Sequence, residues 1–273
     1  MQEIEKEMTF VDHLEALRWH LIRAVASILV FFFIAFSAKT YVFHYLILGP
    51  SRPDFITYQL MCRLGEYLNS PGLCISEITF TLQSRQMSAQ FTMHLLVSLI
   101  LGLVAAFPYA FWEIWRFIKP GLYPNEQKHS RGAVFFVSIL FLIGVAFGYF
   151  IVAPLSINFL ASYQVDPTII NEFDLSSYIS TLTSLTLACG LMFELPVIVY
   201  FFTKAGILTP ELMRLYRRHA LVVIFIISAI ITPPDVMSMM LIAFPLLLLY
   251  EVSIWVSAAI RKSDIKKLNK QTE

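Results

Sequence analysis

The stretch AVFFVSILFLIGVAFGYFIVAPL, residues 133 to 155, decides the fold because it contains no charged residue over a length that can cross a bilayer. About 20 apolar residues in a helix span a hydrocarbon core roughly 30 Å thick, and a helix satisfies its own backbone hydrogen bonds there. Three further stretches have the same character: Ala24 to Phe43, Phe91 to Trp112 and Leu175 to Phe202. The sequence therefore predicts an all-α membrane protein.

The composition of the whole chain agrees with this prediction. Of its 273 residues, 58% are hydrophobic and 14% are charged, and the mean hydropathy is +0.70. A water-soluble domain of this size is more polar. The N-terminal segment MQEIEKEMTF is acidic and lacks the basic region of a removable signal peptide, so we expect the first span to stay in the mature protein.

A longer apolar tract, Ala220 to Ala259, is interrupted by the sequence TPPD. Two prolines prevent a continuous helix, and the aspartate opposes burial in lipid. The tract is therefore predicted to form a hairpin of two spans. Its first arm, Ala220 to Ile231, rises only about 18 Å at 1.5 Å per residue, which predicts a short fifth span. Four residues make the turn between the arms: Thr232, Pro233, Pro234 and Asp235.

Six spans place both termini on one side of the membrane, and the loop cations predict which side that is. Sixteen of the 20 lysines and arginines lie in segments on the side of the termini. Only Lys39, Arg52, Arg63 and Arg85 lie on the other side. The positive-inside rule therefore predicts that both termini are cytoplasmic.

These spans make residues 1–273 a single six-helix transmembrane domain. A cytoplasmic amphipathic lead-in precedes the first span, and a basic cytoplasmic tail follows the last. The segments outside the spans are the lead-in 1–23, the first outward loop 44–90, the cytoplasmic loop 113–132, the second outward loop 156–174, the cytoplasmic loop 203–219 and the tail 260–273.

The three cysteines allow at most one outward disulfide. Cys62 and Cys74 share the first outward loop, where a disulfide can persist, whereas Cys189 lies in a span. Pairing cannot be read from sequence alone, so a Cys62–Cys74 disulfide and two free thiols both stay open.

The chain carries no motif of a catalytic or metal site. None of its ten glycines begins a nucleotide-binding P-loop, and neither H-E-x-x-H nor G-x-S-x-G occurs. The six histidines show no metal-ligand spacing with the cysteines. We therefore expect neither an enzyme nor a bound cofactor or metal.

Two features inside the spans require an explanation. Gly144 and Gly148 form a small-x-x-x-small pattern, which favours a close internal helix contact over an oligomer interface.

Glu194, in LMFELPVIVY, lies about 12 Å of helix from the end of its span at Phe202. A carboxylate at that depth must be paired, protonated or exposed to a wet cavity. A neutral glutamate bonded to a neighbouring span is the structural alternative, and a functional site is the default hypothesis.

Two acids on the predicted cytoplasmic face are candidates to bind an incoming cation. The lead-in FVDHLEALRWHLIRA is amphipathic and places Glu15 three residues before Arg18, where an ion pair between them is the simpler interpretation. The sequence RFIKPGLYPNEQKHSR breaks the helix at its prolines and presents Glu126 on a loop. Solvation beside Lys128 and Arg131 is the alternative for Glu126.

Four motifs in order along these spans resemble one family, TatC, the multispanning receptor subunit of the twin-arginine protein translocase. They are HLEALRWHLIR near the N-terminus, FIKPGLYPNE after the second span, FELPV in the fourth span and ITPPDV between the last two. The resemblance covers nearly the whole chain. It implies a curved, glove-like arrangement of six helices with short fifth and sixth spans. It also implies a role in exporting folded proteins across the bacterial inner membrane.

The resemblance further implies a cytoplasmic site for twin-arginine signal peptides. Pro50 and Asp235 match structural positions of the outward loops, and Glu194 matches the acid of the fourth span. The implied partners are the signal peptides of folded cargo proteins, single-span subunits of the TatA and TatB type, the lipid bilayer and further copies of the chain. The residues implied for signal-peptide binding are Glu15, Arg18, Phe117, Tyr123 and Glu126.

The chain departs from the family pattern at one important place. The glutamate of the family's H-L-x-E-L-R is replaced by Ala16, and Glu15 stands one residue earlier, which rotates the side chain by about 100 degrees. Either Glu15 binds at a different angle, or Glu126 carries most of the charge recognition. His20 also replaces the second basic residue of the motif.

Two other functions stay open at this point. A proton-coupled secondary transporter also places an acid at mid-depth, but it usually has internal repeats or interrupted midplane helices in matched positions, and neither is evident in the sequence. A structural assembly subunit without cargo contact is the second alternative.

Overall fold

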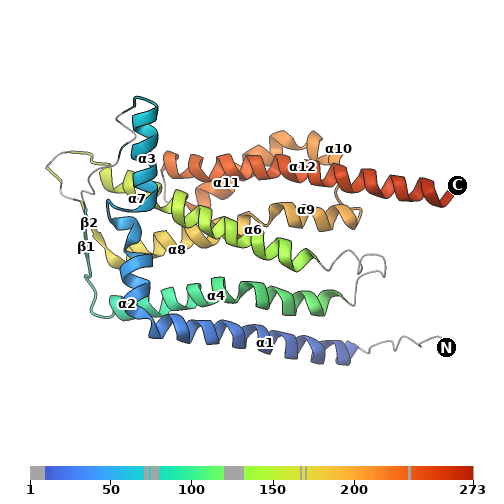
Figure 1. Cartoon of the computed structure of the whole chain (residues 1–273), viewed down its shortest axis with the longest axis horizontal. Coiled ribbons are helices and arrows are strands. Elements are labelled where there is room, and N and C mark those ends of the chain that lie inside the picture. Colours follow the sequence, from blue (N-terminus) through green and yellow to red (C-terminus); the bar gives the residue numbers. More distant parts are fainter. Residues whose placement is uncertain are drawn as a thin grey trace. The chain divides into compact units, whose positions relative to one another are not determined.

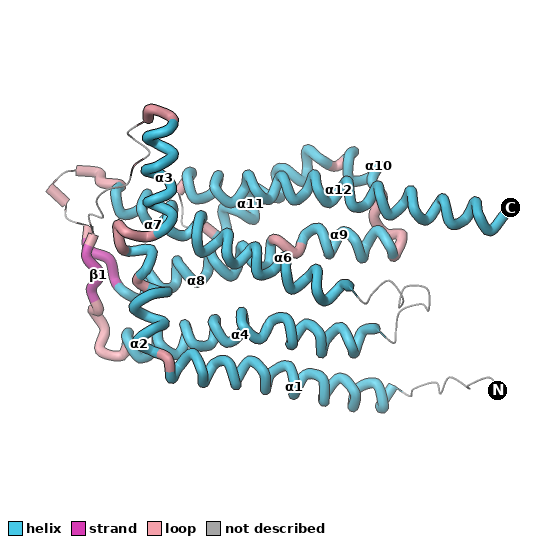
Figure 2. The backbone as a smooth tube through the Cα atoms, viewed as in Figure 1, coloured by secondary structure: helices cyan, strands magenta, loops and turns pink. Residues whose placement is uncertain are grey.

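The computed structural model describes residues 10–70, 74, 80–119, 132–166, 168–169, 171–232 and 235–272. Most of this part of the chain is helical, and two short strands pair beside the helices (Figures 1 and 2). The elements run in this order: α1 Phe10–Ser37, α2 Lys39–Tyr41, a π-helical turn Val42–Ile47, a tight helical turn Gly49–Ser51, α3 Ile56–Tyr67, β1 Thr81–Gln83, α4 Ala89–Ile118, α6 Ala133–Phe147, a second π-helical turn Gly148–Val152, α7 Ala153–Ser162, β2 Glu172–Asp174, α8 Leu175–Met192, α9 Leu195–Lys204, α10 Pro210–Leu215, α11 Arg217–Ile231 and α12 Val236–Thr272.

Five helical stretches within the described ranges are long and apolar enough to cross a membrane. They correspond to the four long predicted spans and to the second arm of the hairpin, so the prediction of a mostly helical membrane protein is confirmed. The expectation of a short sixth span is wrong, because this arm lies in the 37-residue helix α12 and offers 25 residues long and apolar enough to cross a membrane. The short first arm forms α11, whose 15 residues rise about 22 Å, less than the hydrocarbon thickness. The five stretches are Leu14–Ser37, Ala89–Ile118, Ala133–Ser162, Leu175–Lys204 and Ser238–Lys262.

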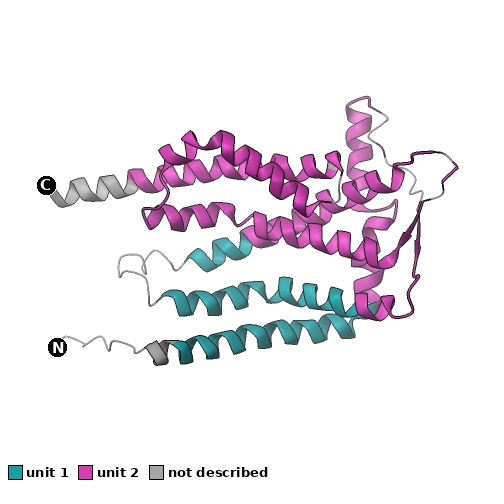
Figure 3. Ribbon diagram, turned by 180° about the vertical axis from the view of Figure 1, so that it is seen from behind, with its two compact units in different colours: residues 1–39, 94–139 teal, residues 40–93, 140–273 magenta. Residues whose placement is uncertain are grey.

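The chain forms two compact units, residues 1–39 with 94–139 and residues 40–93 with 140–273 (Figure 3). In the first unit α1 and α4 approach closely at Gly102, where a Cβ would lie 2.8 Å from the backbone nitrogen of Phe32. The His94 ring of α4 stacks on Phe36 of α1 with 4.1 Å between centroids and donates from Nε2 to the Phe36 carbonyl at 3.1 Å. Close backbone packing thus joins the two helices.

In the second unit Gly144 of α6 and Gly148, which begins the following π-helical turn, pack against α8. A Cβ at Gly144 would lie 2.6 Å from the carbonyl oxygen of Cys189, and one at Gly148 would lie 2.8 Å from the Cα of Thr186. Neither position has room for a side chain. The interpretation of the two glycines as an internal helix contact is therefore confirmed.

Hydroxyl groups on neighbouring helices donate hydrogen bonds to backbone carbonyls where the predicted first outward loop begins. The last carbonyls of a helical segment have no partner within it, and here tyrosine hydroxyls supply the missing donors. The Phe150 carbonyl lacks a partner for another reason, because Pro154 has no N–H, and Thr57 of α3 donates to it instead. Three tyrosines act on the loop: Tyr149 donates to Leu46 at 2.7 Å, Tyr178 to Ile47 at 2.8 Å and Tyr58 to Pro50 at 2.8 Å.

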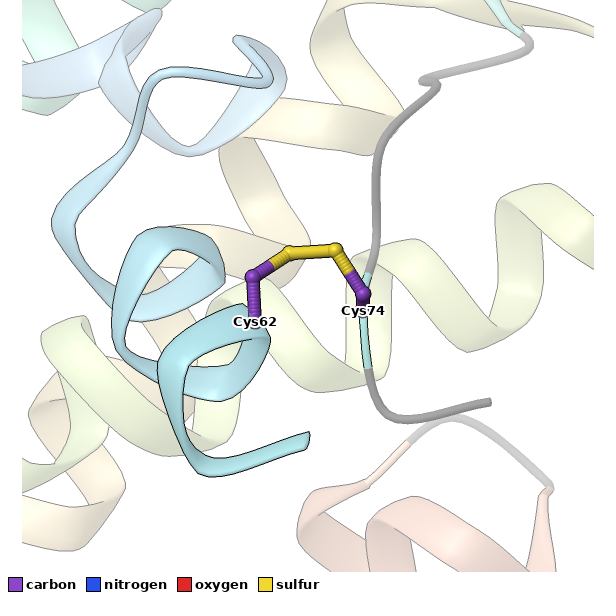
Figure 4. The surroundings of a disulfide bond; sticks show 2 residues. All are labelled: Cys62 and Cys74. Atoms are coloured by element: carbon purple, nitrogen blue, oxygen red, sulfur yellow. A yellow bond between two sulfur atoms is a disulfide. The ribbon is translucent and has the colours of Figure 1, made fainter. Parts of the chain in front are cut away.

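Covalent and strand contacts hold the rest of the outward region. Cys62 on α3 and Cys74 are joined by a disulfide (Figure 4), and Cys189 is a buried free thiol. β1 and β2 pair in parallel, with Leu82 opposite Phe173 at the centre of the register. The described parts of the two predicted outward loops are therefore joined within the second unit.

Candidate functional site

The first turns of α1 and the last turns of α4 lie side by side within the first unit (Figure 1). The Nδ1 atom of His20 on α1 lies 2.5 Å from Oε2 of Glu113 on α4, across 93 positions of sequence. These two helix ends belong to the segments that the sequence analysis assigned to ligand recognition. The candidate site is therefore built where α1, which carries the first motif, contacts the part of α4 that leads into the second.

Glu113 is the buried acid of this contact, with only 1% of the residue exposed. A buried charge is tolerated only when it is paired and hydrogen-bonded. His20 donates to Oε2, and Tyr109, one turn earlier on α4, donates its hydroxyl to Oε1 at 3.0 Å. The guanidinium of Arg23 lies 3.9 Å from Oε2. Both oxygens of the carboxylate are thus satisfied, one from each helix.

Sequence reasoning missed Glu113 because it ended the second span at Trp112 and placed residues 113–132 in a loop. The helix continues to Ile118, so Glu113 lies inside it. A signal was present in the sequence, since the acid stands among aromatic residues, four positions after Tyr109 and four before Phe117. The argument that identified Glu194 applies equally to this position.

The predicted signal-peptide residues divide into three described side chains and two others. Glu15 and Arg18 are exposed on the first turns of α1, and no ion pair joins them in the described part of the chain. Phe117 is half-buried near the end of α4, and its ring centroid lies 6.2 Å from that of His20. Tyr123 and Glu126 lie outside the described residues.

The replacement of the motif's glutamate by Ala16 has a visible structural context. Ala16 and His20 are half-buried and Ala24 is buried, and their spacing of four residues puts them on one face of α1. Glu15 lies on an exposed face of the same helix. The Glu15 carboxylate therefore lies on a different side of α1 from position 16, where the family motif has its glutamate.

Glu194 lies at an interruption that the sequence analysis did not predict. Phe193 and Glu194 separate α8 from α9, so the fourth span is not one continuous helix. Pro196 explains the break, because it has no N–H for the carbonyl of Met192 and its ring crowds the preceding turn. Both carboxylate oxygens of Glu194 are buried, no side chain of the described residues hydrogen-bonds to them, and the backbone of Phe141 on α6 interacts with the carboxylate.

Three of the five residues predicted to support the outward loops are described by the structure. Pro50 is fully buried, and its carbonyl receives the Tyr58 hydroxyl. Thr232 is buried and donates its hydroxyl to the Ser228 carbonyl at 2.9 Å at the end of α11. Asp235 accepts the backbone N–H of Ser238 at 2.6 Å and so caps α12. Pro233 and Pro234 lie outside the described residues.

The described ranges contain no group of three or more histidine, cysteine, aspartate or glutamate side chains that could hold a metal ion. The polar groups of the candidate site are the carboxylates of Glu113 and Glu15, the imidazole of His20 and the guanidinium groups of Arg18 and Arg23. Such groups can bind a charged peptide by ion pairing and hydrogen bonding.

Comparison with known proteins decides the family. A family model described as Sec-independent protein translocase protein (TatC) matches residues 12–245, which include both ends of the candidate site. The chain belongs to the TatC family. A TatC protein of Blattabacterium sp. subsp. Periplaneta americana is 36% identical over 264 residues, which are 96% of this chain and 99% of the relative. A TatC protein of Helicobacter pylori is 46% identical over 161 residues, 59% of this chain and 63% of the relative.

Solved structures of the TatC family agree with this membership. A crystal structure described as the twin arginine translocase receptor TatC superposes with a TM-score of 0.69 at 32% identity, covering 90% of this chain and 98% of that one. A second, in DDM, gives a TM-score of 0.70 at the same identity. The family supports the receptor interpretation over both the secondary transporter and the assembly subunit without cargo contact.

Proposed function

We propose that this chain is the receptor subunit of a twin-arginine translocase, which binds the signal peptides of folded cargo proteins and organises TatA- and TatB-type partner subunits for their export. One observation carries the proposal: the TatC match extends from residue 12 to residue 245, a range that contains both recognition segments. The role is one of transport, with no catalysed reaction.

The recognition mechanism rests on the difference between arginine and lysine. A guanidinium forms two parallel, charge-assisted hydrogen bonds with a carboxylate, and an ammonium cannot reproduce this geometry. Glu126, with Glu15 beside it, would bind the paired arginines of the signal peptide. Each such bond contributes about 1.5 to 3 kcal/mol when partly desolvated, so two can supply a hundredfold or more in affinity.

Three further side chains complete the proposed site. Phe117 packs the apolar residue that follows the arginines, and its half-buried position leaves part of the ring available to a ligand. Tyr123 and Arg18 would contact the same peptide. Lysine-for-arginine peptides would keep these apolar contacts and lose the bidentate ones.

The proposed topology places this site in the cytoplasm. Six spans, with α11 as the short fifth, put both termini on the inner side of the bacterial cytoplasmic membrane. Supporting this, sixteen of the 20 lysines and arginines fall in the segments assigned to that side. The domain is single, residues 1–273, with loops at 44–90, 113–132, 156–174 and 203–219.

For Glu194 we propose contact with a partner helix in a wet groove of the membrane. Its place at the break between α8 and α9 supports this proposal, because no side chain of the described residues hydrogen-bonds to its carboxylate. Wild-type export and wild-type partner binding by Glu194→Leu would exclude the wet groove.

Binding of labelled twin-arginine and twin-lysine peptides to the purified protein tests the proposed function. The wild type should bind the twin-arginine peptide at least about a hundredfold more tightly. Glu126→Ala and Glu126→Gln should lose most of this difference, whereas Glu172→Gln, at an exposed acid of β2, should keep it. Equal affinity of the wild type for both peptides would exclude charge recognition by these carboxylates.

A further inference from the structure

A single imidazole connects the two recognition segments. His20 lies on α1 five residues after Glu15, and it contacts two residues of α4. Its Nδ1 lies 2.5 Å from the Glu113 carboxylate, and its ring centroid lies 6.2 Å from that of Phe117. Because Glu113 and Phe117 are four residues apart, they share one face of α4. The contact therefore reaches from the lead-in to the aromatic residue of the proposed site.

Burial distinguishes this contact from an ordinary surface ion pair. The side chain of Glu113 is 2% exposed and that of His20 is 17% exposed, whereas the Arg23 side chain is 50% exposed. A surface pair contributes little because water competes for both partners. A buried carboxylate that loses its partner is left uncompensated, which is strongly unfavourable. His20 is thus tightly constrained by Glu113, and Arg23 is not.

The contact also fixes how α1 lies against α4. A hydrogen bond of this length tolerates little sliding or rotation of either helix. One residue of rotation moves a side chain by about 100 degrees around the helix, which would separate the imidazole from the carboxylate. The exposed carboxylate of Glu15 and the ring of Phe117 are consequently held in one arrangement.

We propose that His20 and Glu113 form a positioning pair, which holds the lead-in of α1 against the end of α4 so that Glu15 and Phe117 present a fixed spacing to the twin-arginine motif. This inference rests on the proposed function. The pair does not contact the signal peptide. Its effect is on the arrangement of the residues that do.

The variants for a test follow from the chemistry of the pair. His20→Ala removes the donor, Glu113→Gln removes the charge while keeping a similar shape, and the double variant removes both. His20→Arg keeps a hydrogen-bond donor for Glu113 and restores the basic residue of the family motif. The matched control is Glu251→Gln, which breaks the 2.7 Å ion pair between Arg217 of α11 and Glu251 of α12 in the other unit.

Two measurements on the purified full chain are needed. The first is the ratio of affinities for twin-arginine and twin-lysine peptides, together with the thermal unfolding midpoint. The second is the distance distribution between spin labels at Leu17→Cys and Ile118→Cys, two positions that are 39% and 45% exposed. The native cysteines do not interfere, because Cys62 and Cys74 are bonded and Cys189 is buried.

His20→Ala and Glu113→Gln should each reduce the affinity ratio by about tenfold and broaden the label distance, and the double variant should be no worse than either. His20→Arg and Glu251→Gln should retain the wild-type ratio and distance. A wild-type ratio in His20→Ala would overturn the positioning pair alone. The positioning pair would also be refuted if the affinity ratio fell only in proportion to the thermal unfolding midpoint and His20→Arg did not restore it. Absence of any peptide preference in the wild type would instead overturn the proposed function.

Discussion

The hydroxyl of Tyr58 on α3 lies 2.8 Å from the carbonyl oxygen of Pro50 and 3.1 Å from that of Pro154, and it donates between the two. Tyr58 is only 1% exposed, and burial raises the pKa of its phenol, so the proton stays in place at any physiological pH. This one side chain ties the start of the first outward loop to the end of the third span.

Tyr58→Phe should lower the free energy of unfolding by about 1 to 3 kcal/mol, because two buried carbonyls lose their donor while the ring still fills its space. Thermal unfolding in detergent measures the loss. Tyr67→Phe on the same helix is the control, since Tyr67 is 85% exposed and should change stability very little. Equal effects of the two substitutions would contradict the role assigned to Tyr58.

Gly144→Leu should destabilise the protein by at least about 1 to 3 kcal/mol, because the new side chain collides with the backbone of α8 at Cys189. Ala146→Leu, two residues along the same helix at an exposed position, should stay within about 0.5 kcal/mol of the wild type. The comparison uses unfolding midpoints in the same detergent. A tolerated leucine at Gly144 would mean that α6 and α8 do not pack at this distance.

The Cys62–Cys74 disulfide closes a loop with a sequence separation of 12, which corresponds to about 3 kcal/mol in the chain-entropy model. Cys62→Ser and Cys74→Ser should each lower stability by up to that amount. A reductant should lower the unfolding midpoint of the wild type to theirs and should leave both variants unchanged. A variant that still responds to reductant would show that another bond is involved.

Asp235→Ala should cost about 0.5 to 2 kcal/mol, because it removes the side chain that caps α12. Asp235→Asn retains an oxygen for the Ser238 N–H and should lower stability by only about a few tenths of a kcal/mol. Hydrogen exchange of the first amides of α12 locates the effect. If asparagine were as harmful as alanine, the charge rather than the cap would be the function of this residue.

Hydrogen bonds lower the pKa of Asp174 below its ordinary value of 3.8, first from the Ser176 hydroxyl and then from the Arg85 N–H at 3.3 Å. Because the pKa of Asp174 is lower in the folded state, its ionised carboxylate stabilises the fold at every pH above the unfolded pKa of about 4. This stabilisation is lost as the pH falls through the folded pKa. Ser176→Ala should therefore raise the pKa of Asp174, as measured by NMR titration. The exposed neighbour Ser177→Ala is the control, and an equal rise there would refute the assignment.

Much of the architecture follows from local features of the chain. Hydropathy located the long helices, since an uncharged run such as residues 133–155 has no stable alternative to a helix in lipid. The prolines after Thr232 located the hairpin, and the arrangement of motifs indicated the family. The break at Glu194 was also encoded locally by Pro196, although sequence reasoning read that span as continuous.

What the sequence by itself determined, then, are properties that depend on neighbours along the chain: the position and polarity of the long helices, the break at the prolines after Thr232 and the family motifs. Only the tertiary structure decided which distant groups meet, such as His20 with Glu113, Gly144 with Cys189 and Cys62 with Cys74. The physical reason is that such contacts depend on how helices pack in three dimensions. A single residue of rotation turns a side chain by about 100 degrees, and periodicity alone does not fix which helix lies opposite.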